Sequence, residues 1–205
     1  SLPSAVLAIC GANLPIISLP TLADPATAGH LALAIRLLDV PEQIVTTSTT
    51  PILQHRLATV GMSERCGLLM KGTGTVLALV GVAMLLLATG GLLVDPWIAG
   101  TRWHGVGTAL VIALPLQIGL SVSGVLISVA SILRAELPAL PVHAAFVAAI
   151  WIAANQSSSV TWAMVAFGIA ALVRAGALLA VLAWSHLRTA GLDIEREQAA
   201  RHDLD

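Results

Sequence analysis

The stretch VTWAMVAFGIAALVRAGALLAVLAWSHL, residues 160–187, decides the class of fold. A helix needs about 20 mostly apolar residues to cross the hydrocarbon core of a bilayer, and this run is longer and holds a single charged residue, Arg174. At about 1.5 Å per residue the arginine is roughly 20 Å from either end, too far for easy contact with an interface. The stretch predicts a transmembrane helix with a cation near its middle.

The rest of the chain has the composition of an integral membrane protein. Of its 205 residues 57% are hydrophobic and 10% are charged, whereas an ordinary globular domain carries about 25% charged residues. The two cysteines lack the spacing of a metal site or a disulfide framework. The sequence also lacks the glycine-rich phosphate loop, the zinc-protease motif and the nucleophile elbow. We expect no enzyme activity, no cofactor, no metal site and no nucleic-acid partner.

Six segments are long and apolar enough to predict membrane-spanning helices. They are residues 2–22, 27–52, 72–94, 106–133, 137–154 and 160–187, with turn-forming or polar residues between them. One of these separators is Gly61–Gly67, and the last is the polar stretch of residues 155–159. The chain is therefore expected to be all-α and polytopic, with a six-helix bundle over residues 1–188 and a polar cytoplasmic tail at 189–205.

Basic residues in the loops predict the orientation, because Lys and Arg concentrate on the cytoplasmic side. With both ends of this segment in the cytoplasm, the outer side holds only Arg102. The inner side then holds Arg56, Arg65, Lys71, Arg134, Arg188, Arg196 and Arg201. Tryptophan favours both membrane interfaces, and four of the five tryptophans fall at expected outer ends: Trp97, Trp103, Trp151 and Trp162.

The second expected span carries a polar stripe on one face. Its members recur every three or four residues and occupy a sector of roughly 100°: Arg36, Asp39, Gln43, Thr46, Thr47 and Thr50. Such a face points to protein or water rather than lipid, and Pro41 within it predicts a kink. The stripe could line a cavity. Alternatively, it could hold helices together, with Arg36 paired to Asp39 and the threonines bonded to their own helix.

The fourth expected span carries a second stripe on one narrow face, formed by Gln117, Ser121, Gly124, Ser128 and Ser131. Small residues allow membrane helices to pack closely, so helix packing is the favoured role for the glycine and the serines. The bulkier Gln117 is a better candidate for lining a cavity.

Arg174 lies among small residues, Gly168, Ala171, Ala175 and Gly176, that would let another helix approach. A cation at the bilayer centre costs about 2.5–3.5 kcal/mol on insertion scales. It therefore calls for a partner: Asp39 or Glu42 of the second span, another part of the protein, or an anionic ligand in a cavity.

The order of these residues resembles a known family. Asn13-Leu14-Pro15 is followed by the run from Ala28-Gly29-His30 to Arg36-Leu37-Leu38, then Pro41, and Gln54 and Arg56 near the inner end. This is similar to the start of the second half of Wzx-type oligosaccharide flippases of the MOP superfamily. The resemblance implies spans seven to twelve of a twelve-helix transporter, with the N-terminal lobe outside this chain. Arg36 matches the family's arginine in the eighth span, whereas Arg174 matches by its place in the last span alone.

What the resemblance implies is a flippase of the bacterial inner membrane. It would move undecaprenyl-pyrophosphate-linked oligosaccharide between leaflets by alternating access, for polysaccharide or O-antigen synthesis. Its partners would be that anionic lipid-linked sugar, the other lobe and membrane lipids. The expected cavity residues are Arg36, Arg174, Asp39, Gln43 and Gln117. The alternatives are a cation-coupled multidrug exporter of the same superfamily, a membrane-embedded polyprenyl-phosphate enzyme, and a structural membrane subunit.

Overall fold

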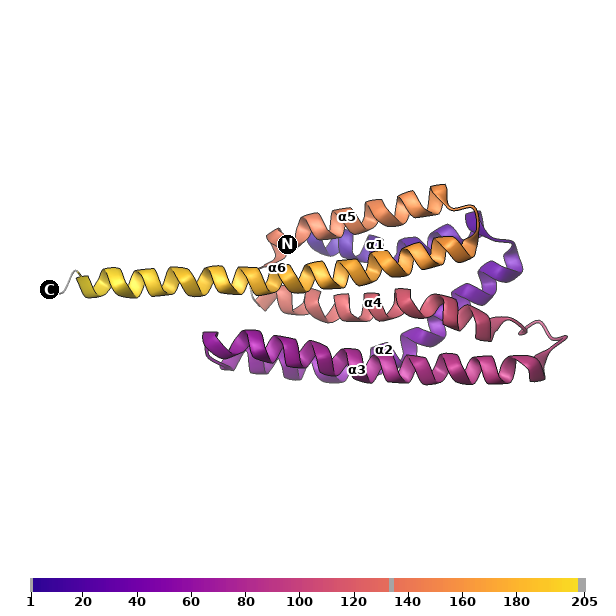
Figure 1. The fold of residues 1–205 in the computed structure, drawn as a ribbon, viewed down its shortest axis with the longest axis horizontal. Coiled ribbons are helices and arrows are strands. Elements are labelled where there is room, and N and C mark those ends of the chain that lie inside the picture. Colours follow the sequence, from indigo (N-terminus) through magenta and orange to yellow (C-terminus); the bar gives the residue numbers. More distant parts are fainter. Residues whose placement is uncertain (1, 133–134, 203–205) are drawn as a thin grey trace.

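The computed structural model describes residues 2–132 and 135–202, which form an elongated bundle of helices (Figure 1). In chain order the helices are α1 (Leu2–Leu22), α2 (Pro25–Thr59), α3 (Met62–Val94), the short 3-10 helix η1 (Asp95–Ile98), α4 (Val106–Ile132), α5 (Glu136–Gln156) and α6 (Val160–His202). The described residues contain no strand. The prediction of an all-α protein is confirmed.

Five described helical segments are long and apolar enough to cross a membrane, and they belong to α1, α3, α4, α5 and α6. The chain is thus a polytopic α-helical membrane protein. The expected second span is the exception, because the charged and polar residues of α2 leave it without a sufficiently apolar window of 18 residues. Its 35 residues exceed the length needed for a crossing, so a sixth span stays an expectation that rests on length and packing.

One expected boundary is wrong. The segment Gly61–Gly67 is too long a separator, because the break ends at Gly61 and α3 begins at Met62. Helix α6 continues through the expected polar tail as far as His202 and leaves the bundle (Figure 1). Hydropathy locates the part of a helix that lies in lipid, whereas a helix can continue into water beyond it. Residues 203–205 lie outside the described chain.

The chain starts and leaves the bundle at the same end (Figure 1). This arrangement agrees with antiparallel helices of even number, on which the predicted orientation depends. Of the residues used for that prediction, Arg134 and the side chains of Arg188, Arg196 and Arg201 lie outside the described part. The side chains of Trp97, Trp103, Trp151 and Trp162 are exposed on the helix bundle, as side chains at a membrane interface would be.

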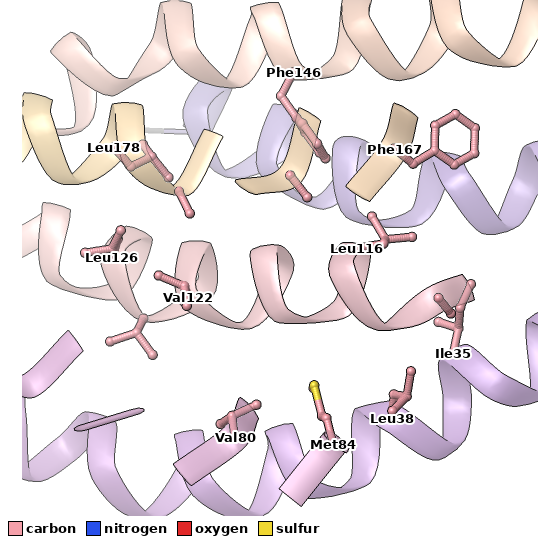
Figure 2. Close-up of a cluster of buried hydrophobic side chains, with 14 of the residues drawn as sticks. Ile35, Leu38, Val80, Met84, Leu116, Val122, Leu126, Phe146, Phe167 and Leu178 are labelled. Atoms are coloured by element: carbon pink, nitrogen blue, oxygen red, sulfur yellow. The ribbon is translucent and has the colours of Figure 1, made fainter. Parts of the chain in front are cut away.

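Helix α4 is the centre of the bundle, since 56% of its span is buried against 22–39% in the other four. It packs mainly against α6, α3 and α2, whereas α1 packs mainly against α5. Figure 2 shows Leu116, Val122 and Leu126 of α4 between apolar side chains of α3 and α6. The outer pair α1 and α5 is therefore joined to the rest chiefly through α6.

Small residues bring α4 close to α6, as expected from the neighbours of Arg174. A Cβ atom added at Gly168 would lie 2.8 Å from Pro115 Cβ, and one added at Gly119 would lie 2.6 Å from the Ala171 carbonyl carbon. Gly124 does not share this role, because a Cβ there meets nothing within 4 Å. The expected packing role of Gly124 is wrong.

Helix α2 connects the two sides of the bundle. It crosses the bundle obliquely in its first part and runs beside α3 in its second (Figure 1), with Pro41 near its middle. Proline removes one helical hydrogen bond and bends a helix. At the start of α2, Asp24 caps the helix by accepting from the backbone N–H groups of Ala26 and Thr27 at 3.0 and 3.1 Å. The Glu42 edge of α2 contacts α4, where the Ser121 hydroxyl donates to the Glu42 carboxylate.

Candidate functional site

A cavity of about 240 Å³ lies between α1, α2, α4 and α6. Four of the five expected cavity residues line it, namely Arg36, Asp39, Gln117 and Arg174. Gln43 does not, and its side chain is exposed. Three further polar residues line the cavity that were not among those expected: Asn13, Glu42 and Ser123. The two arginines, 138 positions apart in the chain, thus line one cavity from two different helices.

The α2 and α4 walls are joined by hydrogen bonds to two carboxylates. The Gln117 Nε2 amide donates to Asp39 Oδ1 and lies 3.5 Å from Glu42 Oε2. The Ser121 hydroxyl donates to the same Glu42 oxygen at 2.8 Å. Gln117 is 2% exposed, and its Oε1 has no hydrogen-bond partner among the described residues. Both acids therefore accept hydrogen bonds from neutral groups of α4, and a buried acceptor stays available beside them.

Arg36 lies at the rim of the cavity. Its side chain is 72% exposed, and its Nη1 lies 3.9 Å from Asp39 Oδ2 one turn along α2. The local pair between Arg36 and Asp39 that the sequence suggested is present, at the long end of ion-pair distances. An exposed pair of this kind adds little stability, because water screens both charges. The guanidinium keeps most of its hydrogen-bond donors free for a ligand.

Arg174 is the buried cation of the cavity, with 3% of its surface exposed. Its Nη2 donates to His143 Nδ1 at 3.2 Å, and its guanidinium carbon lies 4.5 Å from the centre of the Phe146 ring. Its Nε has no hydrogen-bond partner among the described residues. The expected pairing of Arg174 with Asp39 or Glu42 is not among the described ion pairs. Both partners come instead from α5.

His143 and Phe146 are partners that the sequence argument missed. His143 is 1% exposed and Phe146 is 3% exposed. They are three residues apart on α5, so they lie on one helix face. A histidine within an apolar span was the available signal, but the sequence does not show which other helix it faces. An arginine has no acceptor, so the bonded Nδ1 must be unprotonated.

A second hollow of about 480 Å³ continues the polar surface between α2 and α4. Glu42 and Gly124 line both hollows, so the two are adjacent. Hydroxyl groups of α2 line the second one: Thr46, Thr47 and Thr50. The hydroxyl of Thr46 donates to the Glu42 carbonyl at 2.7 Å, and that of Thr47 donates to the Gln43 carbonyl. This back-bonding is the one expected for helix threonines, and it leaves the oxygen lone pairs able to accept.

Serine residues of α4 divide between these two surfaces. Ser128 lines the second hollow, and its backbone carbonyl lies 3.3 Å from the amide Nε2 of Gln54 on α2. Ser123 lines the first cavity and donates to the carbonyl of Gly119 at 2.8 Å. The side chain of Ser131, the last residue of the predicted stripe, lies outside the described part. The stripe on α4 thus faces α2, where it forms the wall of a polar groove.

No family model, characterised protein or solved structure matches this chain. The class follows from the molecule alone: an α-helical polytopic membrane protein with a polar cavity between its helices. Among the described residues, no three His, Cys, Asp or Glu side chains gather in a way that could hold a metal ion. The polar groups that line the cavity are arginine, carboxylate, amide and hydroxyl groups.

Proposed function

We propose that this chain is one lobe of a flippase that moves a lipid-linked anionic oligosaccharide across the bacterial inner membrane. The observation that carries the proposal is Arg174, a buried cation whose described partners are both neutral. A guanidinium binds phosphate through parallel, charge-assisted hydrogen bonds. A pyrophosphate or acidic sugar in the cavity would supply the negative charge that Arg174 lacks.

The charges around the cavity support an anionic ligand at one particular place. Asp39 has both Arg36 and the Gln117 amide nearby, and Glu42 accepts from Ser121. These acids are thus engaged on the α2–α4 side of the cavity. Arg174 enters from α6, where its Nε is buried and has no partner in the described part of the chain. An anion beside α6 would meet attraction from Arg174 and lie on the far side from the engaged acids.

The groove between α2 and α4 supports a sugar as the polar part of the substrate. Sugar hydroxyls donate and accept hydrogen bonds, and the groove together with the adjoining cavity offers both kinds of group. Threonine oxygens, the Gln117 carbonyl and carboxylates can accept, whereas Arg36 and Asn13 can donate. The cavity and the adjoining hollow have volumes of about 240 and 480 Å³, whereas pockets for drug-sized ligands measure about 300–1,000 Å³. A few sugar residues fit this scale.

A cation-coupled exporter is the second candidate, favoured by a separate observation. Asp39 and Glu42 line the same cavity and both lie beside the Gln117 amide. Carboxylates inside membranes commonly relay protons or bind coupling ions. This reading predicts that Asp39→Asn and Glu42→Gln abolish transport of a cationic drug, whereas alanine at Arg174 has little effect. The flippase proposal predicts that alanine at Arg174 lowers polysaccharide export more than Asp39→Asn or Glu42→Gln does.

The test uses the full-length protein in a bacterium that lacks its own copy of the gene. Arg174→Ala, Arg174→Lys, Arg36→Ala and the control Arg102→Ala are expressed, and both surface polysaccharide and membrane protein level are measured. We expect Arg174→Ala to lower export at least about tenfold, which equals about 1.4 kcal/mol. Lysine at position 174 should restore part of it, since charge is kept without the bidentate geometry. Arg102 lies in the loop before α4, outside the cavity, so its variant should export normally.

Normal export by Arg174→Ala and Arg36→Ala, alone and combined, would contradict the proposal. Loss of the protein from the membrane in Arg174→Ala, with Arg174→Lys stable and fully active, would assign a structural role to the charge. Binding of pyrophosphate to the purified full-length protein in detergent separates these readings further. The proposal requires that binding be weakened by Arg174→Lys.

A further inference from the structure

A groove of about 410 Å³ lies between α5 and α6, and Arg174 is the lining residue that it shares with the polar cavity. Every lining residue except Arg174 is apolar. The groove is hollow because small residues form its walls. Ala145 and Ala149 lie one turn apart on α5, and Ala170 and Ala177 lie two turns apart on α6.

Arg174 lines both this groove and the polar cavity. Its guanidinium lies over the Phe146 ring at 4.5 Å, and Phe146 also lines the groove. The Nε of Arg174 is buried and has no partner among the described residues. A fixed positive charge therefore stands where an apolar surface and a polar surface meet. In a membrane, an apolar groove by itself would hold any lipid chain, and the arginine is what gives this one a chemical preference.

We propose that the α5–α6 groove holds the hydrocarbon tail of an anionic lipid whose phosphate lies against Arg174. This inference rests on the proposed function and adds to it the place of the tail. In a lipid-linked sugar the phosphate joins the apolar tail to the polar head. Arg174 occupies the corresponding position in the protein, with the apolar groove on one side and the hydroxyl- and amide-lined cavity on the other. The tail stays in an apolar surrounding while the head occupies the cavity, so neither part is moved into an unfavourable medium.

The geometry of the walls makes the groove accessible to steric tests. Ala149 lines the groove, whereas its neighbour Ala148 is exposed and does not line it. On α6, Ala177 lines the groove. Tryptophan at Ala149 or Ala177 would fill the space for a tail. Tryptophan at Ala148 would add the same bulk to a lipid-facing surface, so that variant provides the control.

The experiment uses the full-length protein in nanodiscs and a long-chain polyprenyl phosphate with a photoreactive diazirine in its tail. After irradiation, labelled peptides are located by mass spectrometry. We expect labels on α5 and α6 at the groove, reduced at least about tenfold by Ala149→Trp and by Arg174→Ala. Labels should be unchanged in Ala148→Trp. A neutral polyprenol with the same tail should label the groove much less, since it has no charge for Arg174.

Equal labelling by the phosphate and by the neutral polyprenol would overturn the inference, because it would show a tail surface without charge recognition. Labelling elsewhere on the bundle would overturn it as well, and the wild-type protein alone decides that point. Should Ala149→Trp fail to reach the membrane, Ala149→Leu and Ala177→Leu supply the steric test.

Export measurements separate this inference from the proposed function. If Arg174→Ala stops polysaccharide export while Ala149→Trp and Ala177→Trp both export normally, the flippase stands and the groove is not the tail site. If the phosphate probe labels the groove as expected but arginine variants export normally, the anionic-lipid site stands and the flippase proposal fails.

Discussion

The contact of α4 with α6 at Gly119 predicts that one added methyl group should loosen the centre of the bundle. A Cβ at this position would lie 2.6 Å from the Ala171 carbonyl carbon, 2.7 Å from Ala171 Cβ and 2.8 Å from the Leu172 nitrogen. Two of these atoms belong to the backbone of α6, which cannot rotate out of the way. Gly119→Ala must therefore push α4 and α6 apart.

The size of the effect follows from two opposing contributions. Overpacking of a tight core costs about 1–3 kcal/mol, whereas replacing glycine by alanine inside a helix stabilises it by about 1 kcal/mol. Gly124→Ala on the same helix provides the reference, because a Cβ there meets nothing within 4 Å. The helix contribution is common to both variants and cancels. Gly119→Ala should be less stable than Gly124→Ala by about 1–3 kcal/mol.

The assay is reversible unfolding of the purified protein in mixed micelles by increasing SDS, followed by circular dichroism and tryptophan fluorescence. Both variants and the wild type are compared at equal detergent concentration. Gly124→Ala should unfold at the wild-type SDS fraction or above it, and Gly119→Ala below it. Equal stability of Gly119→Ala and Gly124→Ala would refute the reasoning, because it would show that α4 and α6 do not approach so closely.

Two further predictions use the same assay. Ser121→Ala removes the 2.8 Å hydrogen bond to the Glu42 carboxylate and the 2.7 Å contact with the Gln117 carbonyl of its own helix, and it should cost about 0.6–1.7 kcal/mol; Ser123→Ala, which removes only a bond to its own helix, should cost less, and equal losses would contradict the cross-helix bond. Asp24 accepts hydrogen bonds from the side chain and backbone of Thr27, which lower its pKa from 3.8. A lowered pKa gives stability that is present above about pH 4 and disappears as the pH falls through the folded-state value. The stability difference between wild type and Asp24→Ala should therefore shrink between about pH 5 and about pH 2, and a constant difference would count against the cap.

Much of the fold could be predicted because lipid imposes a length and a composition on each span. The apolar runs identify α1, α4 and α5 within a few residues of their observed bounds, and they identify the start of α6. The start of α3 was missed because its first residues are polar and include glycine. Those features mark the limit of the apolar layer, and the backbone can stay helical beyond it.

The candidate site shows which features of a helix its periodicity can predict and which it cannot. At about 100° per residue, Arg36 and Gln43 lie roughly 40–60° to one side of Asp39, and Glu42 lies roughly 60° to the other. Periodicity identifies a polar sector but does not show which edge of it faces another helix. In the structure Ser121 of α4 contacts the Glu42 edge. Gln43 and most of Arg36 consequently remain exposed.

The partner of Arg174 could not be predicted, since it lies on a different helix and carries no opposite charge. A carboxylate would have neutralised the guanidinium and satisfied its donors together. His143 and Phe146 satisfy the donors of the guanidinium only in part. They do not neutralise its charge, because a histidine that accepts at Nδ1 from an arginine is neutral and so is a phenyl ring. The pair holds the guanidinium in a defined orientation and leaves its full positive charge in the cavity wall. A buried charge kept in place but not balanced is costly unless something else balances it, and an anion that enters and leaves the cavity would do so only while it is bound.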